Sequence, residues 1–429
     1  MKDGKKTAVP KLRFPEFLDE GDWTTERLGS VAMISTEKVG KNVCVPMSIT
    51  SGVGLVSQVD KFGRVIAGDS YKNYLLLKPN DFAYNKSATK EYPEGFLTLY
   101  SGTELAAVPN SIFTCFRIHG ESPDTRFLNY QFSGNLHGRW LRKFIQVGAR
   151  AHGSLSISDG DLMALPVPVP AGSKSVAEQQ KIANCLSSLD DLIVAQMRKV
   201  EALKSYKLGL MQRLFPRSGE TIPRLRFPEF RDAPDWIEAP LGELFDTSSG
   251  GTPDRTKQEY WNGSIPWVTT SLVDFNFITK TDEFISQAGL DNSSAKVFPK
   301  GTVLIAMYGQ GITRGKVAIL GIPAATNQAC AAILPNGDVD NDFTFVSLCG
   351  RYEEIRKLSN SGGQANLSQT LIRALPFRYP KNIDEQLKIV EYFSYIDALI
   401  VGAIGKLDAL KIHKEGLMKD LFPPSEASK

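Results

Sequence analysis

The chain has 429 residues and a formal net charge of +3, a charge too small to indicate a nucleic-acid-binding protein by itself. This length is sufficient for two or more hydrophobic cores. No apolar run reaches the ~18 residues of a membrane span, and the first residues, MKDGKKTAVP, lack the apolar core of a secretory signal. The five cysteines are widely spaced without a C-x-x-C pair, so the sequence predicts a cytoplasmic protein in a reducing compartment.

The chain repeats itself. The octapeptide PKLRFPEF at 10–17 returns as PRLRFPEF at 223–230, and each copy is followed by a tryptophan and then a Leu-Gly pair. Further on, ALPVPVP at 164–170 corresponds to ALPFRYP at 374–380, and the segment 178–216 aligns without gaps with 385–423. Such long repetition predicts a duplicated half and a pseudo-twofold fold.

Two inserts, 29–165 and 242–375, separate the repeated segments; they have similar lengths but share little sequence. Short β-type runs occur at 73–77 and 111–118 in the first insert, and at 301–307, 316–320 and 329–334 in the second. Helical turns are expected near 136–145 and 352–358. Each insert is therefore predicted to be a compact α+β domain, and two such different domains in one frame suggest contacts with different ligands.

Basic, amide and hydroxyl side chains gather on loops of both inserts. Lysine and arginine neutralise phosphates, whereas Arg, Asn, Gln, Ser and Thr read base edges. A single loop of this kind is more often ordinary solvated surface than a binding loop, but the recurrence of such loops in both inserts shifts the balance toward DNA binding. The candidate DNA-binding residues are Lys86, Ser87, Lys90, Arg139, Arg142, Lys143, Arg150, His152, Ser154, Thr252, Arg255, Thr269, Thr270, Tyr308, Gln310, Thr313, Arg314, Lys316, Asn327, Gln364 and Asn366.

The repeated segments 178–216 and 385–423 are predicted to be long helices, because proline is absent until their last residues. Their apolar residues recur in steps of four and three, as in a coiled coil, although an amphipathic helix lying on a domain core is the alternative. Two matched seams favour pairing with each other, and pseudo-twofold symmetry favours an antiparallel pair. The predicted seam residues are Ile182, Leu186, Leu189, Ile193, Val200, Leu203, Leu210, Leu214, Ile389, Phe393, Ile396, Ile400, Leu407, Leu410, Leu417 and Leu421.

Catalytic motifs are not evident in the sequence. YGQGITRGK at 308–316 departs from a phosphate-binding loop at Gln310 and at the following Val317. The four histidines lack metal-ligand spacing, and no Asn/Asp-Pro-Pro-aromatic motif for amino methylation occurs. We therefore predict no catalytic, cofactor-binding or metal-binding residue in this chain.

The alternation of two variable inserts with two repeated helical segments resembles the specificity subunit of type I restriction–modification enzymes. The resemblance rests on L-R-F-P-E-F at Leu12 and Leu225, E-Q-x-K-I at Glu178 and Glu385, and the G-L-M-x-x-L-F-P endings. It implies two target recognition domains that each read half of a bipartite double-stranded DNA site. The exit of the second insert departs from the pattern, since Arg378 stands where the first copy has proline.

The resemblance also implies a non-catalytic subunit whose partners are two methyltransferase and two restriction subunits, with S-adenosylmethionine, ATP and Mg²⁺ held by those partners. The expected fold class is α+β, with two recognition domains separated by two long helices in an antiparallel coiled coil. A stand-alone DNA-binding protein and an enzyme acting on DNA are the alternatives. The predicted recognition domains are 21–170 and 236–380, and the predicted helical spacers are 171–216 and 381–424. The two copies of the N-terminal repeat segment are 1–20 and 217–235, and 425–429 is a tail.

Overall fold

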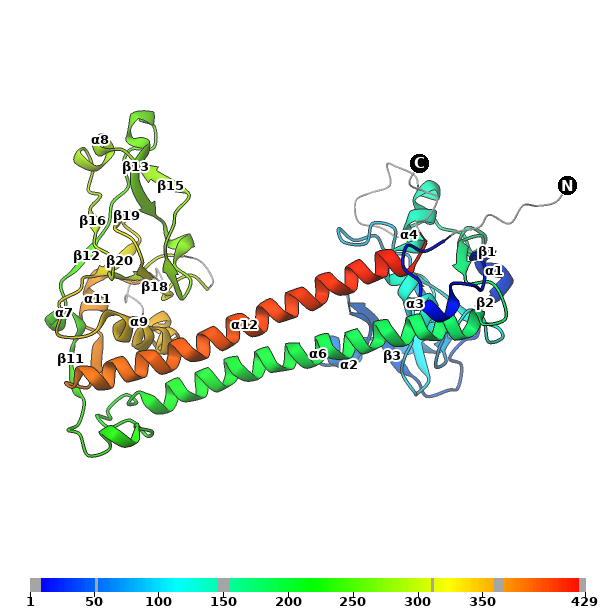
Figure 1. Cartoon of the computed structure of the whole chain (residues 1–429), viewed down its shortest axis with the longest axis horizontal. Coiled ribbons are helices and arrows are strands. Elements are labelled where there is room, and N and C mark those ends of the chain that lie inside the picture. The colour runs from blue at the N-terminus through cyan, green and yellow to red at the C-terminus, as the bar shows by residue number, and fades with distance from the viewer. Residues whose placement is uncertain (1–8, 51–52, 146–154, 310–311, 359–365, 424–429) are drawn as a thin grey trace. The chain divides into compact units, whose positions relative to one another are not determined.

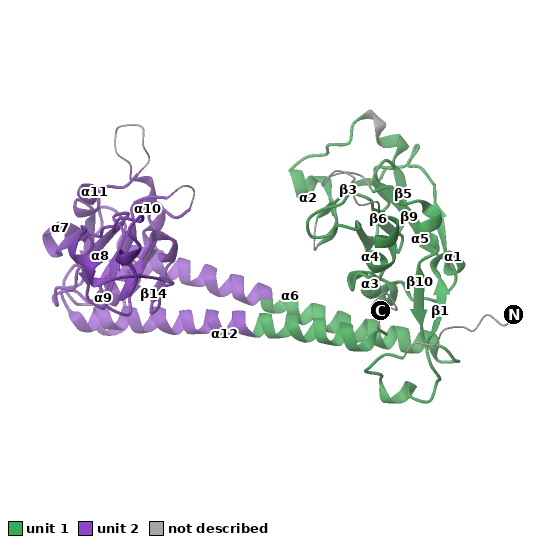
Figure 2. Ribbon diagram, turned by 90° about the horizontal axis from the view of Figure 1, so that it is seen from above, with its two compact units in different colours: residues 1–196, 406–429 green, residues 197–405 purple. Residues whose placement is uncertain are grey.

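A computed structural model describes residues 9–50, 53–145, 155–309, 312–358 and 366–423, and its elements are labelled in Figure 1. The chain divides into two compact units, one formed by residues 1–196 and 406–429 and the other by 197–405 (Figure 2). Two long helices, α6 (Ser175–Leu214) and α12 (Ile383–Leu421), each contribute residues to both units. The predicted linear divisions therefore differ from the compact units, because each unit takes part of both helices.

The first unit contains two four-stranded sheets, of strand order β2-β9-β6-β7 and β4-β3-β8-β5, and the two-stranded ribbon β1-β10. Its strands are β1 (Thr24–Arg27), β2 (Ala32–Ser35), β3 (Val45–Thr50), β4 (Gly54–Ser57), β5 (Leu75–Leu77), β6 (Phe82–Asn85), β7 (Phe96–Leu99), β8 (Ala106–Val108), β9 (Phe113–Ile118) and β10 (Pro166–Val169). Its short helices are α1 (Leu28–Val31), α2 (Gln58–Phe62), α3 (Thr125–Ser133), α4 (Leu136–Leu141) and α5 (Asp159–Met163).

The second unit contains a five-stranded sheet, β12-β20-β17-β18-β14, a four-stranded sheet, β15-β13-β19-β16, and the ribbon β11-β21. Its strands are β11 (Ile237–Pro240), β12 (Thr247–Ser249), β13 (Trp261–Val268), β14 (Asn276–Ile278), β15 (Glu283–Ile285), β16 (Val297–Phe298), β17 (Val303–Ala306), β18 (Val317–Leu320), β19 (Ala324–Thr326), β20 (Cys330–Ile333) and β21 (Pro376–Tyr379). Its short helices are α7 (Leu241–Leu244), α8 (Gln287–Asp291), α9 (Asn341–Gly350), α10 (Tyr352–Lys357) and α11 (Gln369–Arg373). Both units are mixed α and β, so the predicted fold class is confirmed.

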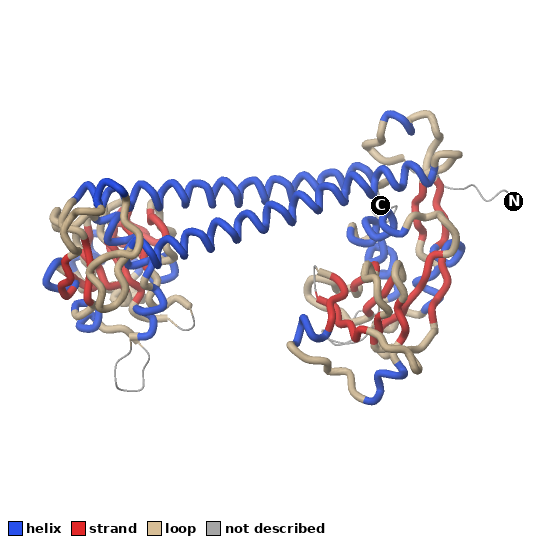
Figure 3. The backbone as a smooth tube through the Cα atoms, turned by 90° about the horizontal axis from the view of Figure 1, so that it is seen from below, coloured by secondary structure: helices blue, strands red, loops and turns tan. Residues whose placement is uncertain are grey.

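The strands β17 and β18 bury both faces of the five-stranded sheet. Side chains alternate across a strand, so Val303 and Ile305 pack into the core that includes the helix α9 and the long helices. Leu304 and Ala306 pack into a second core on the opposite face. This double burial explains why the predicted runs are continuously apolar rather than alternating. In each unit one sheet shares a hydrophobic core with the portions of α6 and α12 that belong to that unit, β2-β9-β6-β7 in the first and β12-β20-β17-β18-β14 in the second. The two long helices are drawn in blue in Figure 3.

The long helices pair in antiparallel fashion within each unit, as the heptad pattern predicts. Every predicted seam residue is buried or half-buried. In the second unit Lys207 Nζ donates to Asp397 Oδ1 at 2.6 Å, and in the first Lys414 Nζ donates to Asp190 Oδ1 at 2.5 Å. Each lysine on the seam thus has a carboxylate on the other helix, which explains how a charged side chain is tolerated there.

In the first unit, the repeated octapeptide is fixed to α6 by a buried ion pair. Arg13 Nε and Nη2 donate to the two carboxylate oxygens of Glu178, both at 2.8 Å, and the two side chains are 8% and 1% exposed. Trp23 Nε1 donates to the same carboxylate at 3.1 Å. The neighbouring Gln179 Oε1 accepts from the backbone N–H of Asp124, the residue that caps α3.

The second unit repeats these contacts with the second copy of each motif. Arg226 donates to both oxygens of Glu385 at 2.7 Å, and Trp236 Nε1 donates to Glu385 at 3.2 Å. Gln386 Oε1 accepts from the N–H of Asp340, which caps α9. The repeated sequence therefore encodes one joint, made twice, that holds together the octapeptide, a long helix and one insert helix, α3 in the first unit and α9 in the second.

The exit of the second insert follows the same path as the first despite its different sequence. β1 pairs with β10 and β11 pairs with β21, both antiparallel. Arg378 forms an ion pair with Glu238, the residue directly opposite it in the ribbon. A cross-strand ion pair therefore takes the place that proline has in the first copy.

His137 makes the stability of the first unit depend on pH. Its side chain is 2% exposed, and burial lowers its pKa from 6.5 to about 4 because the charged imidazolium loses its water. Because the pKa of this base is lower in the folded state, the unfolded state binds more protons. The stability that neutral, buried His137 contributes is therefore present above pH 6.5 and is lost as the pH falls toward 4.

We expect the first unit to lose about 2 kcal/mol between pH 7 and pH 5 through this group. Urea denaturation at both pH values measures the loss, and His137→Phe, which cannot titrate, is expected to flatten the profile over this interval. An unchanged profile in that variant would show that other groups cause the acid sensitivity.

Candidate nucleic-acid interface

Strand directions bring the polar loops of the second insert to one edge of the five-stranded sheet. β12 and β17 both run antiparallel to β20, so their ends meet where β20 begins. β18 is antiparallel to β17 and β14 is parallel to β18, so both begin at that same edge. We call this set of residues, 250–257, 274–275, 308–309, 312–316 and 326–328, the loop edge.

Two glycines allow the first of these loops to approach the strands closely. Gly251 N donates to Thr326 O at 2.8 Å, and a Cβ on the preceding Gly250 would lie 2.0 Å from that same oxygen. The approach places Thr252 beside Gln328, with Thr252 Oγ1 donating to Gln328 Oε1 at 2.5 Å. Asn327, which directly precedes Gln328, donates its backbone N–H to Val268 O at 3.0 Å. A hydroxyl and two amide side chains thus meet at the loop edge.

Arg255 is held in a fixed position on the same loop. Its guanidinium stacks 3.8 Å from the ring centre of Trp261 and 4.8 Å from that of Trp267, and Nη1 donates to Glu283 Oε2 at 2.5 Å. Nearby, the hydrogen bond from Lys257 to the Tyr260 hydroxyl raises the pKa of Lys257. Both cations are exposed.

Thr269 and Thr270 directly follow β13. Thr269 Oγ1 lies 2.6 Å from Ser271 Oγ. Because β13 is parallel to β19, Thr269 and Asn327 follow neighbouring strand ends. The predicted residues Thr269 and Thr270 therefore belong to the same surface as Thr252.

The loop after β17 carries five further predicted residues, and four of them are among the described residues. Lys316 Nζ donates to Asp274 Oδ1 at 2.6 Å, and Arg314 Nη2 donates to the backbone oxygen of Arg356 at 3.1 Å. Tyr308 is 43% exposed, and Thr313 is half-buried. This loop joins the loop edge because β17 and β20 are neighbours.

Asn366 is brought to the same place from far along the chain. The next residue, Leu367, donates its N–H to Met307 O at 3.0 Å, directly before Tyr308. In the first unit Leu155 donates in the same way to Lys86 O at 2.7 Å. The equivalent segments of both inserts thus return to the end of an equivalent strand.

Two polar atoms at the loop edge are buried without a hydrogen-bond partner in the described part of the chain, Arg314 Nε and Asn327 Oδ1. Buried polar groups in folded proteins nearly always have partners, so each such atom calls for an explanation. A bound ligand that both accepts and donates hydrogen bonds would satisfy them. Nucleic-acid bases have both kinds of group on their major-groove edges.

In the first insert, the predicted residues Lys86, Ser87 and Lys90 lie on the loop that follows β6. Lys86 Nζ lies 3.9 Å from Asp159, and Ser87 N donates to Asn85 Oδ1 at 2.8 Å. Lys90 is exposed on the same loop.

A second basic segment reaches this loop through an ion pair. Arg142 Nε donates to Glu94 Oε1 at 2.7 Å, and Glu94 itself is buried. The adjacent Lys143 lies 2.9 Å above the ring centre of Trp140. Arg142 and Lys143 therefore extend the basic surface formed by the loop after β6.

Not all predicted residues are found at these surfaces. Arg139 donates to Gly134 O at 2.9 Å and lines a pocket with residues of α12, so the structure does not bring it to the loop after β6. The predicted residues Arg150, His152, Ser154, Gln310 and Gln364 lie outside the described residues. Conversely, sequence reasoning missed Gln328, which is exposed, although its position directly after Asn327 could have indicated it.

Among the described residues, no group of three or more His, Cys, Asp or Glu side chains could hold a metal ion. No helix in the same residues is long and apolar enough to cross a membrane.

The described chain thus contains a frame that is built twice, and each copy carries a different α+β insert with a polar loop surface. A model of the type I restriction modification DNA specificity domain matches residues 234–409. Over this part of the second unit and of α12, the chain is therefore similar to that family.

Individual curated relatives have names of the same kind. The chain is 26% identical over 252 residues to the EcoR124I/EcoR124II specificity subunit of Escherichia coli, covering 57% of this chain and 58% of that protein. It is 28% identical over 171 residues to the MjaIX specificity subunit of Methanocaldococcus jannaschii, covering 39% of each. The aligned part of the chain thus spans about half the length of these curated relatives or less.

Solved structures share the fold over nearly the whole chain. The S subunit of a type I restriction–modification system from M. genitalium has a TM-score of 0.54 at 18% identity, covering 97% of this chain and 99% of that one. A chain from a study of complex assembly and conformational transition of the type I R-M system has a TM-score of 0.60 at 16% identity, covering 94% and 97%. At such identities the likeness shows the fold alone.

Proposed function

We propose that this chain is the DNA specificity subunit of a type I restriction–modification complex. The observation that carries the proposal is the loop edge, a polar surface with two buried unsatisfied atoms, mounted on a frame that is built twice with different inserts. Different inserts on equivalent frames are the arrangement expected of a protein that reads two unlike half-sites of one bipartite target.

The loop edge has the chemistry needed for both parts of DNA recognition. Lys257, Arg255 and Lys316 are cations suited to phosphates, which position a protein without specifying sequence. Arg314, Asn327 and Gln328 have the guanidinium and amide groups that pair with guanine and adenine edges. In the first unit, Lys86, Lys90 and Arg142 would supply the phosphate contacts.

The long helices offer equivalent surfaces for two copies of a partner. Apolar side chains that are exposed in this chain recur at matching positions of the repeat, and large apolar exposure indicates an interaction surface. The matching pairs are Leu192 (56% exposed) with Leu399 (42%), Val194 (43%) with Val401 (69%), and Met197 (48%) with Ile404 (37%). Because a duplicated surface suits two identical partners, we assign these faces to two methyltransferase subunits.

The remaining functions of the complex would belong to its partners. In this proposal two restriction subunits join the methyltransferase-bound chain. Adenine methylation with S-adenosylmethionine and ATP-dependent cleavage with Mg²⁺ are carried out by the partners, and this chain contributes DNA recognition alone.

Co-expression of the chain with the methyltransferase encoded beside it tests this function. Mapping of methylated adenines across the host genome is expected to give one bipartite motif with unread bases between its halves, and no such motif when the chain is omitted. Methylation that is unchanged without the chain would contradict the proposal. Equally tight specific binding by the chain alone would support a stand-alone DNA-binding protein instead.

A further inference from the structure

The repeated ending G-L-M-x-x-L-F-P of the long helices has a feature that DNA reading does not explain. In each unit the second leucine of this motif is buried, since Leu421 is 1% and Leu214 is 2% exposed. The phenylalanine that follows it, Phe422 or Phe215, is only half-buried. Both phenylalanines line pockets, together with the methionine and proline of the same motif. The sequence repeat thus places the same three apolar side chains in two pockets.

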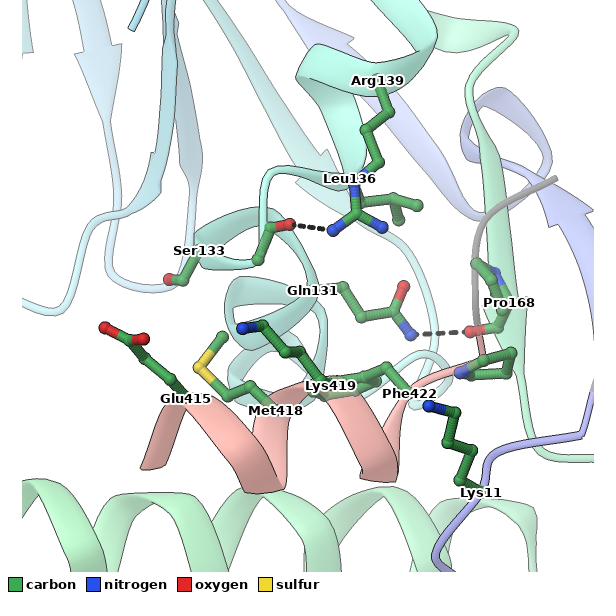
Figure 4. A pocket seen from close by; sticks show the side chains of 12 residues that line it. Lys11, Gln131, Ser133, Leu136, Arg139, Pro168, Glu415, Met418, Lys419 and Phe422 are labelled. Carbon is green, nitrogen blue, oxygen red and sulfur yellow. Dashed lines mark hydrogen bonds between the residues drawn. The ribbon is translucent and has the colours of Figure 1, made fainter. Parts of the chain in front are cut away.

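The first pocket lies between the end of α12 and the helices α3 and α4, and has a volume of about 470 Å³. Figure 4 shows Met418 of α12 and Phe422, which directly follows α12, on one side, Leu136 on the other, and Pro168 at one end. The side chains of Met418, Phe422, Leu136 and Pro168 form an apolar floor. The volume of the pocket suits one or two large side chains.

The second pocket is built in the same way from the second copy. Met211, Phe215 and Pro216 at the end of α6 lie against the end of α9, in a pocket of about 330 Å³. The methionine lies beside a glycine in both pockets, since a Cβ on Gly350 would lie 3.7 Å from Met211 Cβ and a Cβ on Gly134 would lie 3.7 Å from Met418 Cε.

The aromatic surroundings of the two phenylalanines also match. Phe422 packs against Trp23 and Phe127, with ring centres 6.4 and 5.4 Å apart. Phe215 packs against Trp236 and Phe343, at 5.8 and 5.7 Å. These contacts hold each ring in place, so the pockets are preformed in the chain by itself.

The rims of both pockets are positively charged. The first is lined by Lys11, Arg139 and Lys419 against one carboxylate, Glu415, and Asp420 lies 3.9 Å from Lys11.

The rim of the second pocket has Arg217, which is exposed, and Arg351, which is already paired with Glu354. An apolar floor disfavours a phosphate backbone as the occupant. A cationic rim around such a floor instead complements an apolar side chain flanked by carboxylates.

We propose that each pocket binds a large apolar side chain of an acidic segment on a partner protein, and that the two pockets receive the same segment from two copies of one partner. This inference rests on the proposed function, because the partner we assign is the methyltransferase subunit. It adds a second contact, distinct from the exposed helix faces, that ties each partner to the joint between a long helix and an insert.

Substitutions at equivalent exposed positions test this inference. Lys419→Trp fills the first pocket and Gln212→Trp fills the second, since both residues line the pockets and neither is buried. The probe is the co-expressed methyltransferase subunit, whose copies bound per chain are counted by native mass spectrometry. Lys72→Trp, an exposed position in the first unit away from both pockets, is the control.

The unaltered chain and the control are expected to bind two methyltransferase copies. Each single variant should weaken one of the two binding steps about tenfold or more, as expected for a blocked anchor pocket, and the double variant should weaken both. Circular dichroism and thermal melting unchanged from the control exclude misfolding as the cause.

The failures of the two proposals are distinguishable. If the unaltered chain binds no methyltransferase, the proposed function is wrong. If it binds two copies and the double variant binds two with equal affinity, the pocket inference alone is wrong. Weaker DNA binding by the double variant without its partner, at unchanged methyltransferase stoichiometry, would assign the pockets to DNA and also overturn the inference.

Discussion

Replacing Glu178 by glutamine is expected to reduce the free energy of unfolding of the first unit by about 3–5 kcal/mol. The substitution keeps the shape of the side chain but leaves the Arg13 guanidinium, 8% exposed, without its counter-charge. Removal of one member of a buried ion pair is far more costly than replacement of both members by apolar residues. The double variant Arg13→Met, Glu178→Leu is therefore expected to be more stable than Glu178→Gln.

Hydrogen exchange followed by mass spectrometry measures this effect for each unit separately. Glu178→Gln should reduce protection in the β1-β10 ribbon and α3, which the joint holds together. Glu385→Gln, the matched substitution in the second copy, should instead affect the β11-β21 ribbon and α9. Loss of protection by less than about 1 kcal/mol, or equal loss in both units from either substitution, would contradict the role given to this joint.

Replacing Arg314 by alanine is expected to weaken binding of the specific DNA by about 1–3 kcal/mol and to relax one position in a single half of the target. The reason is that its buried Nε has no partner within the described residues, while Nη2 is oriented by the backbone oxygen of Arg356. Lysine should not restore selectivity, because it cannot reproduce the planar fork of arginine.

Fluorescence anisotropy with specific and scrambled duplexes, at several salt concentrations, measures these effects. Lys316→Ala should weaken both duplexes similarly and reduce the salt slope by about 1, as for a phosphate contact. Lys300→Ala is the control, because Lys300 is exposed and precedes β17, at the opposite edge of the sheet. Unchanged affinity and selectivity in the Arg314 variant would mean that the loop edge is not the reading surface.

Local patterns in the sequence predicted the long helices and their seam well. A heptad repeat is a property of neighbouring residues, and Ile182 and Phe393 are buried because that periodicity places them on one helix face. The strands β9, β17, β18 and β20 also form within two residues of the predicted apolar runs. Duplication made these predictions stronger, because each pattern occurs twice.

Features that depend on contacts distant in sequence could not be predicted in this way. The octapeptide was noticed, but nothing local indicates that Arg13 pairs with Glu178, 165 residues later. Likewise, Arg139 and Arg142 are close in sequence and chemically alike, yet one lines the first pocket and the other pairs with Glu94. Residues three apart on a helical segment lie on nearly the same face, so local geometry does not separate the two arginines, and only the tertiary fold decides what each contacts.

The claim that each insert reads its own half-site is tested most directly by exchange of one insert. Residues 29–165 are replaced by the first insert of another specificity subunit, the chimaera is co-expressed with the methyltransferase, and methylated adenines are mapped. Because the joints at Arg13–Glu178 and Arg226–Glu385 lie in the unchanged frame, we expect a new sequence in one half of the motif and the original sequence in the other. A change in both halves, or in neither, would contradict the account.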